Sequence, residues 1–166
     1  MISYVMHNTA VETKLNDCFE DLIKVEEIIE KNHLAPSVKY LTCYAVIKAC
    51  STIEHCFKQL IADKLEVVAP AMSYYINNKV RTSSANPRCD TMSNFLAEYN
   101  KSWSQSFKER VKSHADSSRI KESLASLVNT RNTFAHTGNC PCTFSDVSNY
   151  YVDAIEFLKI IDDILR

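Results

Sequence analysis

The sequence predicts an all-α protein: an antiparallel bundle of four long helices with an insertion of shorter helices at about residues 66–118. The first observation is that the chain has 166 residues but only one glycine and four prolines, whereas average usage would give on the order of a dozen glycines. Tight hairpin turns need glycine, so a sheet protein is disfavoured, and a glycine-rich phosphate loop is excluded. The second observation is that apolar residues recur at steps of three and four along four long segments.

The first two long segments are residues 9–32, which Asn8 or Thr9 can cap, and residues 37–65, the longest. The apolar stripe of the second segment contains Tyr40, Cys43, Tyr44, Ile47, Cys50, Glu54, Phe57, Ile61 and Leu65. Glu54 is seven residues from both Ile47 and Ile61, which places it within about 20° of each on a helix. A carboxylate at that position must be paired, hydrogen-bonded or directed into a cleft.

The stretch from 66 to 118 is less regular, with breaks at Pro70 and at residues 83–87. Short helices are expected at 71–80, 91–100 and 103–114, and we interpret this stretch as an insertion that forms a binding face. Trp103, Phe107 and Val111 give the last of these helices one apolar side.

Two further long helices are expected at residues 117–137 and 144–165. Ser117 or Ser118 is a suitable cap for the first of them, and the only glycine of the chain, Gly138, is placed to terminate it. The length and the single set of long amphipathic segments predict one domain over residues 1–166.

Charge and cysteine usage indicate the compartment and the partners. The net charge is −1, but a basic segment at residues 79–131 lies between acidic ends, which suits an anionic partner. The seven cysteines are scattered, the first ten residues lack the apolar stretch of a signal peptide, and no apolar run has the roughly 20 residues of a membrane span. We therefore expect free thiols, a cytoplasmic protein and no membrane segment.

Metal binding is disfavoured. His136, Cys140 and Cys142 are close in sequence, but structural zinc normally needs four ligands and often Cys-x2-Cys spacing. We expect neither a metal ion nor another cofactor.

The strongest cluster of polar residues is Arg131, Asn132 and His136, at the end of the helix expected at 117–137. Asn132 and His136 lie one above the other, and the three residues span an arc of about 140°. Arginine supplies a planar, charged fork of donors, histidine can donate or accept a proton near neutral pH, and asparagine can orient the imidazole. Together they suit phosphate chemistry without a metal. The alternative is that Arg131 and His136 only cap the last carbonyls and stabilise the helix dipole.

The segment Arg131-Asn132-Thr133-Phe134-Ala135-His136 resembles the signature of the HEPN superfamily (higher eukaryotes and prokaryotes nucleotide-binding). That signature is an arginine, four to six residues and a histidine, commonly with a polar residue after the arginine. The resemblance covers most of the chain, because two long helices precede the motif helix and one follows it. The small stand-alone prokaryotic members of toxin and defence systems are the most similar. Gly138 stands where some of these toxins carry a modified tyrosine.

The resemblance implies a metal-independent endoribonuclease whose motif helices meet in a homodimer, so that two Arg/His sets form one cleft. The RNA 2′-hydroxyl would attack the adjacent phosphate and leave a 2′,3′-cyclic phosphate. His136 would act as general base or acid, Arg131 would stabilise the charged phosphorane, and Asn132 would orient His136 or the phosphate. Glu54 would position Arg131 or tune His136, although a buried structural ion pair explains Glu54 equally well. A toxin or anti-phage defence setting would add an antitoxin or another defence protein as a partner.

A basic surface that could bind the substrate precedes the motif. Its basic residues are Lys101, Lys108, Arg110, Lys112, Arg119 and Lys121, and Tyr99, Trp103 and Phe107 are interleaved with them. The candidate substrate-binding residues among them are Lys108, Arg110, Lys112 and Arg119. Such a surface can bind RNA phosphates and stack unpaired bases, or it can be a solvated helix whose aromatics face inward.

Two other functions stay open. One is a non-catalytic HEPN module that binds RNA, a nucleotide or a protein. The other is a helical scaffold in which the motif helix is buried and His136 only caps carbonyls.

Overall fold

The computed structural model describes residues 4–32 and 34–166, and every regular element within them is a helix. The long helices are α1 (Thr9–Lys31), α2 (Ser37–Val68), α6 (Ser117–Thr137) and α7 (Phe144–Leu165). Between α2 and α6 lie the short elements η1 (Pro70–Met72), α3 (Ser73–Ile76), η2 (Asn77–Arg81), α4 (Cys89–Tyr99) and α5 (Lys101–Ser113). The all-α prediction, with its insertion of shorter helices, is confirmed.

The helix termini follow local sequence signals. Asn8 caps α1 by accepting a hydrogen bond from the Val11 backbone N–H at 3.0 Å. α7 begins with a reciprocal capping box between Thr143 and Asp146. α6 has the predicted bounds, but its N-cap residue is Asp116 and makes no side-chain capping bond, so neither Ser117 nor Ser118 caps it.

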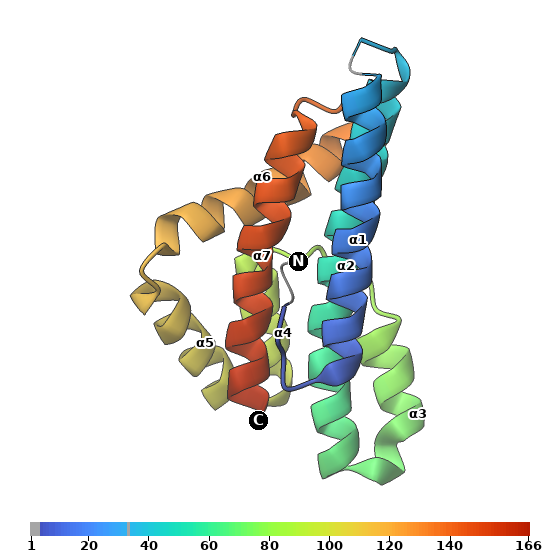
Figure 1. Cartoon of the computed structure of the whole chain (residues 1–166). Helices are drawn as coiled ribbons and strands as arrows, with labels where there is room; N and C mark the ends of the chain where they lie inside the picture. The colour runs from blue at the N-terminus through green and yellow to red at the C-terminus, as the bar shows by residue number, and fades with distance from the viewer. Residues whose placement is uncertain (1–3, 33) are drawn as a thin grey trace.

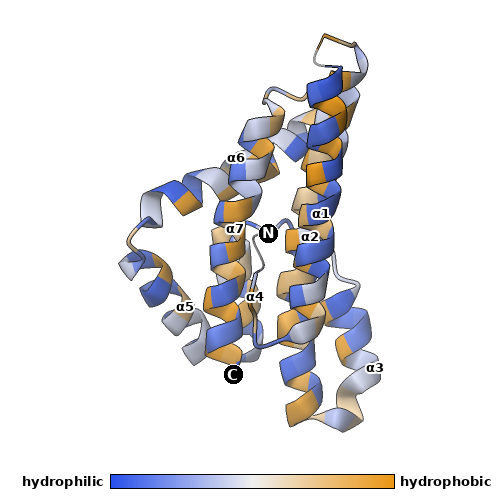
Figure 2. Ribbon diagram, viewed as in Figure 1, coloured by the Kyte–Doolittle hydropathy of each residue, from blue (hydrophilic) through white to orange (hydrophobic). Residues whose placement is uncertain are grey.

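The helices pack around α2 and α7, which contact each other along the middle of the molecule. α1 packs against α2, while α6 contacts both α2 and α7 and crosses them obliquely (Figure 1). The apolar sides of these helices face one another, as the banding in Figure 2 shows. Tyr151 of α7 is fully buried at the centre and donates a hydrogen bond to the Leu15 carbonyl of α1 at 2.9 Å. This contact fixes the two helices relative to each other.

The predicted stripe of α2 is wrong at its N-terminal end. Tyr40, Tyr44 and Ile47 are 73%, 48% and 44% exposed, whereas Cys43 and Cys50 are buried. The buried face of α2 is therefore offset from that stripe at this end of the helix, where Cys43, Ala45, Val46, Ala49 and Cys50 are the buried apolar residues. An apolar period identifies a helix face but not which edge of that face its neighbours cover.

The insertion extends the core rather than forming a separate layer. Phe107 and Val111 of α5 are buried, and the Phe107 ring lies 6.2 Å from the Phe157 ring of α7. No helix in residues 4–32 and 34–166 is long and apolar enough to span a membrane.

Candidate functional site

The motif lies on the last two turns of α6, and Gly138 terminates the helix. Gly138 adopts a left-handed conformation with φ of 69°, and its N–H donates to the Phe134 carbonyl at 2.8 Å. This is the predicted role of the only glycine, since left-handed backbone favours glycine. The chain then turns back into α7, which leaves the C-terminal turn of α6 open to solvent.

Arg131 faces α2 across a cavity of about 260 Å³, whose lining includes Ile47, Ser51, Glu54 and Ser84. Its guanidinium Nη2 donates a hydrogen bond to the Asn86 side-chain oxygen. The buried Cys50 thiol lies beside it: burial raises the pKa of this thiol, and a hydrogen bond with Arg131 opposes that rise. Arg131 therefore lies at the edge of a cavity, and its hydrogen-bond acceptor is a neutral amide.

Glu54 lines the same cavity but binds other groups. Its carboxylate Oε1 accepts hydrogen bonds from the Lys58 ammonium at 3.0 Å and from the Ala85 backbone N–H at 3.2 Å. Lys58 is buried and also donates to the Ser83 carbonyl at 2.6 Å. The ion pair expected as the alternative role of Glu54 is thus present. It attaches the loop of residues 82–88, called here the 82–88 loop, to α2 next to Arg131.

Asn132 and His136 lie on a different side of α6. His136 is exposed and Asn132 partly exposed, and neither makes a side-chain hydrogen bond within the described residues. The last carbonyls of α6 are instead bound by Gly138 and by the Thr137 hydroxyl, which donates to the Thr133 carbonyl at 2.8 Å. The scaffold hypothesis required His136 to cap these carbonyls, and it does not do so here.

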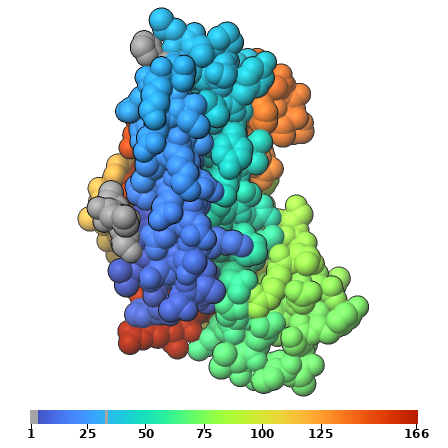
Figure 3. Space-filling model, turned by 45° about the vertical axis from the view of Figure 1, so that its right-hand side comes forward, coloured from blue at the N-terminus to red at the C-terminus, as the bar shows by residue number. Residues whose placement is uncertain are grey.

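Sequence reasoning missed the 82–88 loop, which it interpreted only as a break. Asn86 accepts from Arg131, and Arg88 donates to the Asn129 side-chain oxygen of α6. The loop therefore contacts α6 at the first residue of the motif, Arg131, and just before it, at Asn129. Figure 3 shows the yellow-green atoms of this region and the orange atoms around the end of α6 bordering the same helix, α2. No periodicity marks such a loop, so only the fold reveals its contacts.

The basic residues proposed for substrate binding lie away from the motif. Lys108, Arg110 and Lys112 are on α5, and Arg119 is 12 residues before Arg131, about 18 Å along α6 (Figure 1). Two of them pair with acids: Arg110 with Asp163 at 3.6 Å, and Arg119 with Asp116 at 2.9 Å and Asp153 at 3.1 Å. Because Phe107 packs inward, the solvated-helix alternative describes this surface better.

Two of the thiols lie close together just before α7. Cys140 and Cys142 lie with their sulfurs 3.7 Å apart, and all seven cysteines are free thiols. Within the described residues, no group of three or more histidine, cysteine or acidic side chains is arranged to hold a metal ion.

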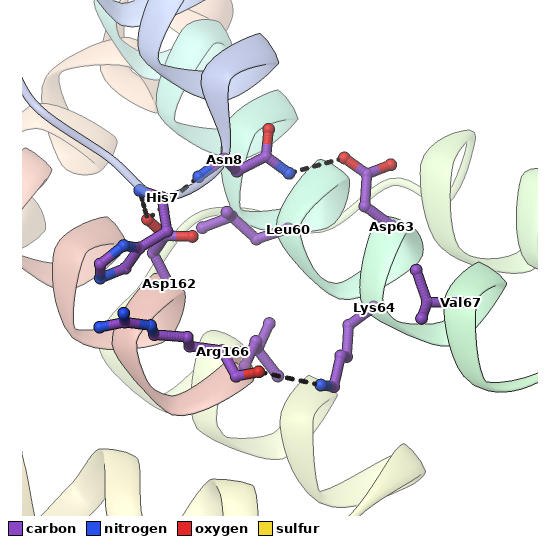
Figure 4. A pocket seen from close by; sticks show the side chains of 9 residues that line it. His7, Asn8, Leu60, Asp63, Lys64, Val67, Asp162 and Arg166 are labelled. Atoms are coloured by element: carbon purple, nitrogen blue, oxygen red, sulfur yellow. Dashed lines mark hydrogen bonds between the residues drawn. The ribbon is translucent and has the colours of Figure 1, made fainter.

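A cavity of about 300 Å³ at the opposite end of the bundle opens to solvent, and the groups that line it form hydrogen bonds with one another (Figure 4). Asn8 donates to Asp63 at 2.8 Å, the His7 backbone N–H donates to Asp162 at 2.5 Å, and Lys64 donates to the Arg166 carbonyl at 3.3 Å. Its polar groups already bind one another, which makes it a weaker candidate than the cavity at Arg131.

Comparison with models of known protein families gives a match for this chain. The family model described as RiboL-PSP-HEPN matches residues 13–166, which include most of α1, the other three long helices and residues 131–136. This chain belongs to the HEPN family. HEPN membership indicates a nuclease or other RNA-related function, since the family includes ribonucleases and its domains often bind RNA and dimerise. Neither the curated proteins nor the solved structures gave a match to this HEPN chain.

Proposed function

We propose that this HEPN protein is a metal-independent endoribonuclease that leaves 2′,3′-cyclic phosphate and 5′-hydroxyl ends. The observation that supports this proposal most is that neither Arg131 nor His136 is paired with a charged group within the described residues. Arg131 lies at a cavity with a neutral hydrogen-bond acceptor, and His136 is exposed without a hydrogen-bond partner in the described residues. A guanidinium that forms no ion pair within the described residues and an exposed imidazole are suited to bind and cleave a phosphodiester.

Each motif residue has a role in this reaction. The RNA 2′-hydroxyl attacks the neighbouring phosphorus, and the bond from phosphorus to the 5′-oxygen breaks. His136 takes the proton from the attacking hydroxyl or gives one to the leaving oxygen. Arg131 binds the non-bridging oxygens and stabilises the charge that develops on the phosphorane. Asn132, one helical turn before His136, orients the imidazole.

The helix geometry favours a site composed of two chains. Arg131 and His136 are five residues apart, which separates them by about 140° around α6 and about 7.5 Å along it. One chain therefore presents them on different sides of the helix, and a second copy would complete the constellation. Ile47 lines the Arg131 cavity. Together with Tyr44 and Tyr40 it forms a row of exposed apolar side chains on α2. This apolar stripe offers a surface for the second copy, as expected of a family whose domains often dimerise.

The resemblance to small stand-alone HEPN toxins supports a cytoplasmic enzyme in a toxin or anti-phage defence setting. An antitoxin or another defence-system protein would then hold the enzyme inactive or activate it.

The test is RNA cleavage by purified protein in EDTA. We expect cleavage with cyclic phosphate ends, and we expect His136→Ala and Arg131→Ala each to slow it by about 100-fold or more. Both side chains are at least partly exposed, so unchanged circular dichroism and thermal melting should confirm that the variants are folded. RNA binding without turnover would favour the non-catalytic module, and cleavage that survives both substitutions would refute the proposal.

Mixing the two inactive variants tests the composite site. If Arg131 of one chain works with His136 of the other, a mixed dimer contains one intact pair, and the mixture should regain part of the wild-type rate. Light scattering should show a dimer. A monomer with full activity would contradict the two-chain site while leaving the ribonuclease proposal intact.

A further inference from the structure

The side of α6 that carries His136 continues toward the N-terminus of the helix. Residues 121, 125, 129, 132 and 136 lie within an arc of about 80° at 100° per residue. Lys121, Asn129 and His136 are exposed, and Asn132 is partly exposed. We call this set of positions the His136 face. Arg131 lies outside it, because it is turned toward α2.

Arg88 brings a guanidinium to the His136 face from another part of the chain. Its Nη2 donates to the Asn129 side-chain oxygen, and Asn129 precedes His136 by seven residues, or about 10 Å along the helix. The acceptor is a neutral amide, and no carboxylate within the described residues forms an ion pair with Arg88. Its positive charge is therefore available to an anion.

The 82–88 loop fixes where this guanidinium lies. The Glu54–Lys58 pair attaches the loop to α2 through Ala85 and Ser83, and Asn86 binds Arg131. Positions 129 and 131 point in nearly opposite directions on a helix, about 160° apart. The loop thus places Arg88 on one side of α6 while it holds Arg131 on the other.

The geometry points to Arg88 as a further substrate-binding residue. Arg88 binds a backbone phosphate of the RNA that lies two to three nucleotides from the phosphate cleaved at His136. This inference rests on the proposed function. The spacing follows from the distance between Asn129 and His136 and from about 3.4 Å per stacked nucleotide. Lys121 lies on the His136 face nearer the N-terminus of α6, and it provides a further positive charge for the RNA backbone. We therefore expect the RNA to bind along the His136 face of α6 instead of along α5.

Binding can be measured without catalysis by using a ten-nucleotide RNA with 2′-O-methyl groups, which cannot undergo 2′-hydroxyl attack. By fluorescence anisotropy at low salt, Arg88→Gln should weaken binding about 5- to 20-fold, as expected for one charge-assisted phosphate contact. The slope of log affinity against log salt should fall by about 0.7. The matched control is Arg166→Gln, which makes the same charge change at the far end of α7 and should bind like wild type.

A second variant separates substrate binding from a structural role. Asn129→Ala removes the protein partner of Arg88 but keeps the guanidinium, so RNA affinity should stay within about twofold of wild type. If Arg88 only anchors the loop, then Asn129→Ala will weaken RNA binding as much as Arg88→Gln does, and the inference is wrong. Thermal melting of both variants verifies that they are folded.

Cleavage of two substrates distinguishes failure of this inference from failure of the proposed function. A dinucleotide lacks the distant phosphate, so Arg88→Gln should leave its cleavage unchanged while raising the KM for a ten-nucleotide RNA. Equal kinetics of Arg88→Gln and wild type on the longer RNA would overturn the role of Arg88 and leave the ribonuclease in place. If wild type neither binds the methylated RNA nor cleaves either substrate, both proposals fall.

Discussion

Two arginines lie against α2, and their surroundings differ. Arg81, at the end of η2, donates to Gln59 at 2.5 Å, to Asp63 at 2.7 Å and to Glu66 at 2.7 Å. Arg131 donates to the neutral Asn86, and the nearby carboxylate of Glu54 is bound to Lys58. The first arginine has two carboxylates of its own, whereas the second lies beside an acid that another cation has neutralised.

This difference separates a structural arginine from a functional candidate. Arg81 connects η2 to α2, and its charge is compensated within the fold. Arg131 retains a net positive charge at the edge of a cavity, where an incoming phosphate can bind it. Composition cannot distinguish the two, because what matters is whether the fold supplies a counter-charge.

The largest expected effect is on catalysis. Arg131→Ala should lower kcat/KM for RNA by about 100- to 1000-fold, the usual cost of losing one group that stabilises transition-state charge. Arg81→Ala should change kcat/KM less than about twofold at temperatures where the variant is folded, since its charge is compensated within the fold. A comparable loss of activity in both variants would mean that the comparison does not identify the functional arginine.

For stability, the larger effect is expected from the substitution of Arg81. Arg81→Ala should lower the free energy of unfolding by about 2–3 kcal/mol, because it removes charge-assisted hydrogen bonds and leaves Asp63 and Glu66 without their cation. Arg131→Ala should cost less than about 1 kcal/mol, since it releases one neutral acceptor near solvent. Urea denaturation measures both values. A larger loss for Arg131→Ala would give Arg131 a structural role instead.

Local signals predicted most of the fold. The bounds of α6 and α7 and the role of Gly138 follow from apolar periodicity and from helix-ending residues. Both signals act within a few residues of the positions that they determine. The resemblance of residues 131–136 to the family signature is equally local, which is why the sequence alone could suggest these residues as the candidate motif.

Contacts between distant residues could not be predicted in the same way. Arg131 and Asn86 are 45 residues apart, and Arg119 and Asp153 belong to different helices. The sequence shows that each is a charged or polar residue, but only the packed helices decide which of them meet. The same reason explains the exposed Tyr40, whose place in the periodic stripe did not reveal that no helix covers it.

A smaller effect is expected at the end of the motif helix. A Cβ at Gly138 would meet no heavy atom within 4 Å, so any cost comes from its φ of 69° alone. Gly138→Val should lower the free energy of unfolding by about 1–2 kcal/mol and should also reduce cleavage, because the turn sets the position of His136. Gly138→Asn is the matched control, since asparagine tolerates this backbone conformation. If valine and asparagine behave alike, the left-handed turn does not constrain the site.

The smallest effect is a pH dependence that belongs to the Arg81 region. Burial alone would raise the pKa of Asp63, but hydrogen bonds from Asn8, Arg81 and Gln59 hold it below its ordinary value of 3.8. The folded state therefore binds this proton less readily than the unfolded chain. The resulting stability is present above the unfolded pKa and is lost as the pH falls through the folded one.

Urea midpoints measured between about pH 6 and pH 3 test this linkage. The gap between wild type and Asp63→Asn should narrow as the pH falls, because wild type loses a contribution that the variant never had. Arg131→Ala keeps Asp63 and its partners, so its midpoints should run parallel to those of wild type. If the Asp63→Asn curve also runs parallel, Asp63 does not stabilise the fold through its charge. The contrast between a compensated and an uncompensated arginine would then rest on hydrogen-bond geometry alone.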